Sequence, residues 1–240
     1  MGIDIGKIIE KIKGRGLFQS ITRYPYLPYD MNIALQVVDA IGKDRNPRFM
    51  IDSENRFAYE NLIRWVHGDE EMKCLDLDTK QVIPARLNAG IYIGGNTGTG
   101  KSWMLEIMAA YCLVDNVQVR VGETKRELFW TNIRTDVICD EYTTEGSVER
   151  FKKMSIVGIQ DLGAEPAESM FMGNRVNVMR QILEFRGDFT DKLTLITSNL
   201  PMKHKVLNER YGDRVSSRLT EMCNYFEISG KDRRKTNVLL

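Results

Sequence analysis

Apolar runs and amphipathic stretches alternate along most of the chain. Apolar residues three or four positions apart predict helices, and short apolar runs bounded by glycine or polar residues predict buried strands. The pattern predicts helices at residues 5–13, 31–41, 57–66, 103–113, 145–153 and 174–185, and strands at residues 91–93, 117–121, 137–139, 155–159 and 193–197. Strands and helices alternate from residue 91 onwards. This order favours an α/β fold with a parallel sheet, helices on its faces, and ligands at the carboxyl ends of the strands.

Three segments between these elements are predicted to lack regular structure. Residues 49–52 form a short extended stretch, and residues 68–85 are polar and are expected to be a loop. Residues 24–29 contain prolines at 25 and 28, and proline disfavours helix in the residue before it. We expect an extended connector there, whose tyrosines either pack against the body of the protein or stack on bases.

The first and second predicted helices raise separate points. In the first, Ile5, Ile8, Ile9 and Ile12 share one face, and a Gly-Arg-Gly stretch at residues 14–16 is expected to end it. This amphipathic helix either docks a partner or folds onto its own domain. The second is expected to stop at Gly42.

Composition excludes several classes of protein. Apolar residues make up 42% and charged residues 28% of the 240 residues, as in ordinary soluble globular proteins. There is no apolar run of about eighteen residues and no apolar signal segment at the start, so we expect a cytoplasmic protein without a membrane span. The four cysteines lack the spacing of a zinc site and are expected to be buried thiols. The net charge of +1 argues against a globally basic nucleic-acid binder, but residues 201–240 carry nine Lys or Arg against five Asp or Glu.

A phosphate-binding pattern gives the chain its first chemical assignment. Gly95, Asn96, Thr97, Gly98, Thr99, Gly100, Lys101 and Ser102 match the P-loop, and they lie between a predicted strand and a predicted helix. Glycines let backbone N–H groups turn around a phosphate chain, and a helix N-terminus adds its positive dipole end. Lys101 is expected to reach the outer phosphates, and the Ser102 hydroxyl to hold Mg²⁺. A nucleotide and Mg²⁺ are therefore the predicted cofactors.

A nucleotide hydrolase also needs acidic groups near the metal ion and the attacking water, at the end of a strand beside the P-loop strand. Two places offer them. Asp140 and Glu141 follow the weaker run at 137–139, whereas Asp161 follows the stronger run at 155–159. Asp161 is the preferred candidate.

Four segments in order resemble one family. They are the P-loop, Gln160 to Pro166, Leu195 to Leu200, and Tyr211 to Leu219. Together they resemble the AAA+ ATPases of the DnaC helicase-loader and IstB transposition-helper type, over roughly residues 51–234. The resemblance implies an AAA+ P-loop ATPase domain at residues 51–240, preceded by a small, mainly helical partner-binding segment at residues 1–50.

The resemblance also implies roles for single residues. Gln160 and Asp161 stand where the family has two adjacent acids, the first serving Mg²⁺ and the second polarising water. An amide is a weaker partner for this cation than a carboxylate. Either Asp161 or Glu165 compensates, or the protein binds ATP and hydrolyses it slowly, which is our hypothesis. Asn199 matches the sensor beside the γ-phosphate.

Arginines complete the implied site. Arg218 and Arg214 lie four residues apart, in the region where the family carries an arginine finger that reaches a neighbouring subunit. Arg233 or Arg234 matches a second sensor. Self-assembly is therefore expected.

The resemblance favours one function and leaves others open. The leading interpretation is an ATPase that uses ATP binding to control the loading of a ring helicase on DNA, single-stranded DNA being favoured. An IstB-like helper that acts on duplex DNA is the nearest alternative. A nucleotide-binding adaptor without useful hydrolysis is a third interpretation. A small-molecule P-loop kinase would leave Asn199 and Arg218 unexplained.

Overall fold

A seven-stranded sheet forms the centre of the protein in the computed structural model, which describes residues 4–13, 20–24, 26–122 and 124–233. Its strands lie in the order β3 (Val82–Pro84), β2 (Lys73–Leu75), β12 (Cys223–Ile228), β4 (Gly90–Gly95), β11 (Leu193–Ser198), β8 (Ile156–Leu162) and β7 (Asn132–Arg134). The five strands from β12 to β7 are parallel, and β2 and β3 add an antiparallel edge. The predicted α/β fold with a parallel sheet is confirmed.

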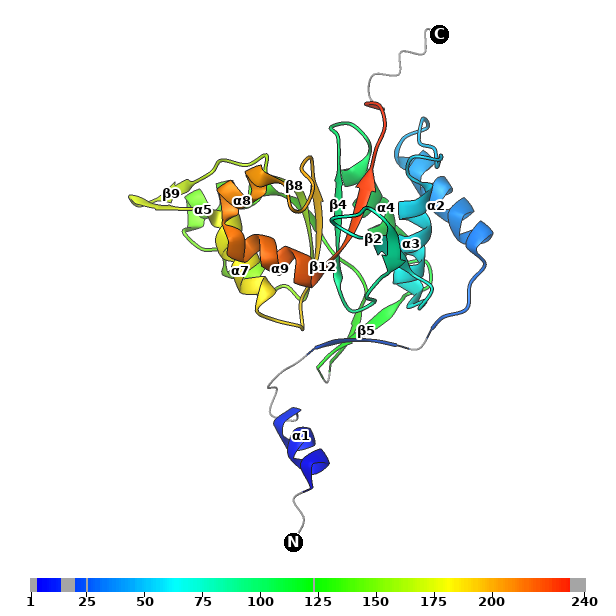
Figure 1. Cartoon of the computed structure of the whole chain (residues 1–240), viewed down its shortest axis with the longest axis horizontal. Coiled ribbons are helices and arrows are strands. Elements are labelled where there is room, and N and C mark those ends of the chain that lie inside the picture. The colour runs from blue at the N-terminus through cyan, green and yellow to red at the C-terminus, as the bar shows by residue number, and fades with distance from the viewer. Residues whose placement is uncertain (1–3, 14–19, 25, 123, 234–240) are drawn as a thin grey trace.

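Helices cover both faces of this sheet (Figure 1). On one face lie α2 (Met31–Arg45), α3 (Arg56–His67) and α4 (Lys101–Tyr111); on the other lie α5 (Thr135–Glu145), α6 (Glu149–Lys153), α7 (Val178–Gly187), α8 (Lys205–Tyr211) and α9 (Asp213–Met222). Side chains alternate along the central strand β4, where Ile91 and Ile93 join the first core and Tyr92 joins the second. A strand buried on both faces reads as a continuous apolar run, which is why residues 91–93 were recognisable.

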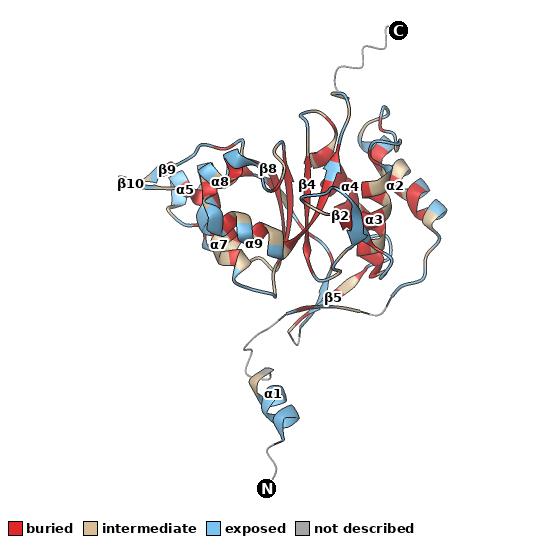
Figure 2. Cartoon of the chain, viewed as in Figure 1, coloured by how far each residue is buried: buried red, intermediate tan, exposed pale blue. Residues whose placement is uncertain are grey.

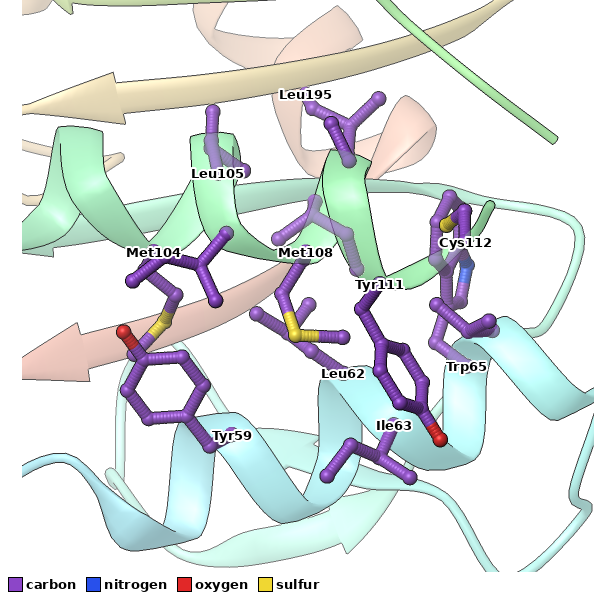
Figure 3. Packing of buried hydrophobic residues seen from close by; sticks show 14 of the residues in the cluster. Tyr59, Leu62, Ile63, Trp65, Met104, Leu105, Met108, Tyr111, Cys112 and Leu195 are labelled. Carbon is purple, nitrogen blue, oxygen red and sulfur yellow. The ribbon is translucent and has the colours of Figure 1, made fainter. Parts of the chain in front are cut away.

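Part of the first core lies between α3 and α4 (Figure 3). Leu62, Ile63 and Trp65 of α3 face Met104 and Met108 of α4 across the cluster, and all of them are almost completely buried. Burying side chains of this size contributes roughly 1.5–3 kcal/mol each. The helix that begins at the P-loop is therefore held firmly in place.

Residues from the N-terminal fifty also enter the first core. Ala34, Leu35 and Val38 of α2 are buried, and α2 packs against both α3 and α4. By contrast, α1 (Ile5–Lys13) exposes its apolar side chains: Ile5 is 67% exposed and Ile8 47% (Figure 2). The predicted stop of this helix at residues 14–16 lies outside the described residues.

Two small sheets lie apart from the central one. The strands β1 (Ile21–Arg23), β5 (Gln118–Val121) and β6 (Thr124–Glu127) form a three-stranded antiparallel sheet, and β9 (Ser169–Phe171) pairs with β10 (Asn174–Val176). The strand predicted at residues 117–121 is therefore present, but outside the parallel sheet. The predicted connector at residues 24–29 forms no helix or strand in its described residues.

Several sequence-based assignments are wrong or incomplete. Residues 137–139 lie in α5 rather than in a strand, because a three-residue apolar run cannot distinguish the two. The predicted loop at 68–85 contains the β2–β3 hairpin. The helix predicted at 174–185 begins only at Val178, after β10, and that at 145–153 begins at Glu149.

Gly42 does not end α2, which continues to Arg45. A Cβ on this glycine would lie 2.1 Å from the ring of Phe49. Gly42 therefore admits a close aromatic contact. Within the described residues, no helix combines the length and apolar character needed to cross a membrane.

Candidate functional site

The P-loop connects the end of β4 to the start of α4. Gly95, Gly98 and Gly100 adopt φ angles of 145°, 81° and 95°, a region that side chains disfavour. Gly95 is restricted by space as well, since a Cβ there would lie 2.1 Å from the carbonyl oxygen of Ile228. Because α4 begins at Lys101, the loop delivers the chain directly into a helix N-terminus, where backbone donors favour anions.

Lys101 and Asn199 meet at this loop although they are far apart in sequence. The Lys101 ammonium donates to the carbonyl oxygens of Gly95 (2.8 Å) and Asn96 (2.7 Å), and to Oδ1 of Asn199 (2.9 Å). Asn199 directly follows β11, the strand that pairs with β4. The chain has a P-loop α/β fold. The structure thus brings together the P-loop lysine and the residue that the resemblance implies as a sensor.

Asp161 lies near the end of β8, close to the first turn of the P-loop helix α4. Its Oδ1 atom is 3.5 Å from Oγ of Ser102. Its strand β8 is separated from β4 by β11, so the expectation that the acid would end a strand adjacent to the P-loop strand is wrong by one strand.

A β-bulge sets the direction of Asp161. The pairing of β8 with β11 shifts between Ile159 and Leu162, so that Gln160 and Asp161 lie opposite Thr197 alone. Asp161 has a φ of 60°, its N–H donates to Thr197 Oγ1 (3.0 Å), and its carbonyl accepts from Thr135 Oγ1 (3.0 Å). Bulges commonly re-aim side chains near functional sites, and this one places the Asp161 carboxylate near Ser102.

Gln160 makes contacts that an acid could not make. Its Nε2 atom donates to Oε1 of Glu106 (3.0 Å) and to the carbonyl oxygen of Ser102 (3.3 Å). Glu106 in turn forms an ion pair with Arg45 at the end of α2, and the Arg45 guanidinium lies 4.9 Å from the ring centroid of Trp103. A carboxylate at position 160 would face two acceptors without a proton to donate.

Glu106 and Arg45 are site residues that sequence reasoning missed. Glu106 was detectable in part, since it lies four residues after Ser102 and therefore on the same face of α4. Arg45 carries no such signal. It reaches the site only because α2 packs against α4.

Glu165, the other acid considered as a substitute, is engaged elsewhere. It is buried, and its carboxylate accepts from the Gly163 N–H (2.9 Å), Nε of Arg210 (3.2 Å) and the Tyr211 hydroxyl. Burial and this neighbouring carboxylate raise the pKa of Tyr211. Glu165 therefore anchors the segment after β8 to α8, and Asp161 is the acid next to Ser102.

The described C-terminal residues lie against the P-loop. The Arg233 N–H donates to the carbonyl oxygen of Gly98 (3.0 Å), and the Arg233 guanidinium pairs with Asp52 (2.8 Å) and Glu54 (3.4 Å). Hydrogen bonding by Arg233 lowers the pKa of Asp52. A Cβ on Gly98 would fall 1.9 Å from Oδ1 of Asp232. Arg233 thus lies beside the loop, and the acidic Asp232 lies against Gly98 of the loop. Arg234 is outside the described residues.

Arg214 and Arg218 lie away from this cluster, on α9. Both pair with Asp188, which follows α7, and Arg218 also pairs with Glu221 (3.2 Å). Within one chain, the structure does not bring them to the P-loop. A finger that acts on a neighbouring subunit would not need to be there.

The remaining candidates for chemistry are accounted for by structure. Asp140 and Glu141 lie within α5, and Glu141 pairs with Arg150 (2.9 Å). All four cysteines are buried free thiols. Over the described ranges, no three His, Cys, Asp or Glu side chains gather in a way that could hold a metal ion.

Several solved structures resemble the chain. A chain from Streptococcus pyogenes serotype M3, suggested to be a primosome component, aligns over 75% of this chain and 81% of its own length, with 19% identity and a TM-score of 0.49. A DnaC helicase loader aligns over 76% of this chain and 94% of its own, with 16% identity and a TM-score of 0.47.

AMPPCP-bound DnaA from Aquifex aeolicus aligns over 78% of this chain, with 16% identity and a TM-score of 0.48, and this chain spans 50% of the DnaA chain. No protein-family model and no curated protein sequence matches.

Proposed function

We propose that the protein is an ATP-binding switch whose nucleotide state controls the loading of a ring helicase on DNA. One observation carries the nucleotide part. The Lys101 ammonium lies at the P-loop, 2.9 Å from Oδ1 of Asn199. A cation and the amide of the implied sensor residue therefore meet where the outer phosphates of ATP would lie. Three glycines with positive φ form the loop around this point, as close approach of a phosphate chain to the backbone requires.

Mg²⁺ fits the same site. The Ser102 hydroxyl and the Asp161 carboxylate lie 3.5 Å apart, and hard oxygen donors of these two kinds suit Mg²⁺, which usually keeps several waters and binds few protein groups. When bound, the ion would offset negative charge on the phosphates. Ser102 and Asp161 would hold it from opposite sides, one from α4 and one from the bulge in β8.

The contacts of Gln160 and Asp161 support slow hydrolysis. Where the resemblance implies two carboxylates, this chain has one, and the bulge turns that carboxylate towards Ser102. Gln160 is occupied as a donor to Glu106 and to Ser102. Neither side chain is then placed to polarise water. We infer that ATP binding, more than ATP turnover, changes the state of the protein.

The partner-binding part of the proposal rests on two helices, α1 and α9. The helix α1 exposes Ile5, Ile8 and Ile9, and an exposed apolar stripe on a helix suits docking into the groove of a partner. Arg218 on α9 remains our candidate for a finger that acts in a neighbouring copy. In that assembly it would exchange its pair with Asp188 for nucleotide phosphate.

Co-purification with a replicative helicase from the same source tests the proposal. We expect a complex whose yield differs between ATP and ADP, and no such difference for Lys101→Ala. Lys203→Ala is the control, because Lys203 is an exposed lysine paired with Asp78 on the surface. Absence of any complex, together with tight binding to duplex DNA, would favour the transposition-helper function instead.

A nucleotide-binding adaptor without hydrolysis is the second candidate, and the Gln160–Glu106 contact favours it. Turnover measured with and without single-stranded DNA separates the two. Complete absence of turnover under both conditions, with ATP binding intact, would support the adaptor.

A further inference from the structure

The three-stranded sheet β1-β5-β6 has one covered face and one open face. Ile21, Val119 and Val121 point into the first core and are at most 8% exposed. Side chains alternate along a strand, so the residues between them point outward. Across the three strands, Thr22 pairs with Arg120 and Arg120 pairs with Lys125, and all three are exposed. The outer face is therefore polar and basic.

Tyr24 continues this outer face beyond β1. The alternation that places Thr22 outward places Tyr24 on the same side, and two cations lie near its ring: Cζ of Arg120 is 5.7 Å and Nζ of Lys125 is 5.6 Å from the ring centroid. The neighbouring Arg23 points inward, donates to the carbonyl oxygen of Val66 (3.0 Å) and packs on Trp65. Arg23 thus fixes the strand while Tyr24 remains at the surface.

The charge of this sheet is unbalanced. Its three strands carry Arg23, Arg120, Lys125 and Arg126 against a single acid, Glu127. Arg120 and Lys125 share the ring of Tyr24 but form no ion pair with an acidic residue in the part of the chain that the structure describes. Most other surface cations of the fold are paired with acids. Two unpaired cations beside one aromatic ring suit an anionic ligand with flat groups.

A cavity opens next to the ring. It has a volume of about 430 Å³, and its lining includes Tyr24, Tyr26, Asn116, Gln118 and Lys125 together with one acidic residue, Asp115. The size is within the range of small-molecule sites. Two residues of the lining, Arg23 and His67, have buried nitrogen atoms (Nη1 and Nδ1) without a hydrogen-bond partner among the described residues. Aromatic rings, amides and a lysine around one cavity provide stacking, base-edge contacts and a phosphate contact.

We propose that the outer face of β1-β5-β6, together with this cavity, binds single-stranded nucleic acid. One base stacks on Tyr24, Arg120 and Lys125 contact the adjoining phosphates, and the next base enters the cavity. Strand-borne aromatic residues flanked by cations bind single strands in this way in other sheets. A duplex keeps its bases stacked inside, so it offers phosphates to the cations but no base to Tyr24.

This site lies at the carboxyl ends of α3 and α4, whereas the P-loop lies at the amino end of α4. The two sites are therefore at opposite ends of the same helix. The inference rests on the proposed function only in taking DNA as the cellular target. Its failure can be told apart from failure of the proposed function, because ATP binding is measured separately.

Fluorescence anisotropy with labelled oligothymidylate tests the site on the full chain. Tyr24→Ala is expected to weaken binding about ten-fold, because it removes one base-stacking contact, and Tyr24→Phe is expected to retain binding. Arg120→Gln is expected to lower the slope of log affinity against log salt by about 0.7, the value for one phosphate contact in a single strand. Lys205→Ala, an exposed lysine on α8, is the matched control.

Further arms identify the ligand. Oligouridylate in place of oligothymidylate shows whether the site distinguishes RNA from DNA, and duplex DNA is expected to bind more weakly than either. Binding of a labelled ATP analogue and the melting temperature are expected to be unchanged in every variant of this sheet. Equal affinity of wild type and Tyr24→Ala, or equal binding of polyglutamate, would overturn the inference, because a charged surface alone would then explain the data.

Discussion

The two sides of the proposed nucleotide site differ in how closely they follow the pattern that the sequence resembles. On the loop side, every residue of the octet is present, and the Lys101 ammonium already has three oxygen partners around the loop. On the acid side, one of the two acids is replaced, and a bulge redirects the other. In the function that we propose, nucleotide binding and hydrolysis are therefore separable, since the groups for each come from different elements.

The same comparison extends to what surrounds each side. The loop side is touched by Asp232 and Arg233, which come from beyond the last strand of the sheet. The acid side is touched by Glu106 and, through it, by Arg45 of α2. The C-terminal segment therefore borders the P-loop, whereas α2 reaches Gln160 through the pair of Arg45 with Glu106.

Lys101→Ala should break the loop side with the largest effect. Removing the ammonium eliminates charge-assisted hydrogen bonds to phosphate worth roughly 1.5–3 kcal/mol each, and two such bonds correspond to about a hundred-fold loss of ATP affinity or more. Titration with a fluorescent ATP analogue measures it, with Lys203→Ala as the control. Unchanged affinity would mean that phosphate binding does not depend on this side of the site.

The sequence predicted the parts of the site that depend on local patterns and missed those that depend on long-range packing. The loop, its strand and its helix were predictable because the octet and the apolar period are local patterns. Asn199 was found through resemblance, and the structure places it at Lys101. Glu106 and Arg45 were missed because the contacts of Glu106 with Gln160 and with Arg45 depend on the packing of α2, α4 and β8.

The bulge was missed for a related reason. Nothing in the residues around Gln160 specifies that β8 has one residue more than its neighbour; only the pairing with β11 shows it. Similarly, the apolar run at 137–139 is too short to reveal that Ile138 and Cys139 belong to the buried face of a helix. Long-range pairing decides both cases.

Replacements at Gln160 test the acid side, and their effect is expected to lie between those of Lys101→Ala and Asp232→Asn. Gln160→Asp alone removes the donor to Glu106 and to the Ser102 carbonyl, and it introduces a second carboxylate beside Glu106. We expect a lower melting temperature and little gain in turnover. The double variant Gln160→Asp, Glu106→Gln restores one donor and one acceptor, and we expect turnover to rise about ten-fold or more, as an added catalytic acid or base permits.

Glu106→Gln alone is the control for this pair. It removes the partner of Arg45 without adding an acid at position 160. An equal rise in turnover for Gln160→Asp and for the double variant would show that Glu106 has no influence. No rise in either would mean that the number of carboxylates does not limit hydrolysis.

Asp232→Asn should give the smallest effect and returns to the loop side. The Asp232 carboxylate lies against Gly98 of the P-loop, where a phosphate chain would bring further negative charge. Neutralising it removes a repulsion of about 1 kcal/mol between unit charges near water, which corresponds to roughly a five-fold gain in ATP affinity. The change keeps the shape of the side chain, so the pairing of Arg233 with Asp52 should persist. Titration with the same ATP analogue measures the gain, and Glu209→Gln on α8 is the control for a lost surface charge. A fall in affinity would show that the C-terminal segment helps to build the nucleotide site. Binding would then depend on the residues after β12 as well as on the P-loop.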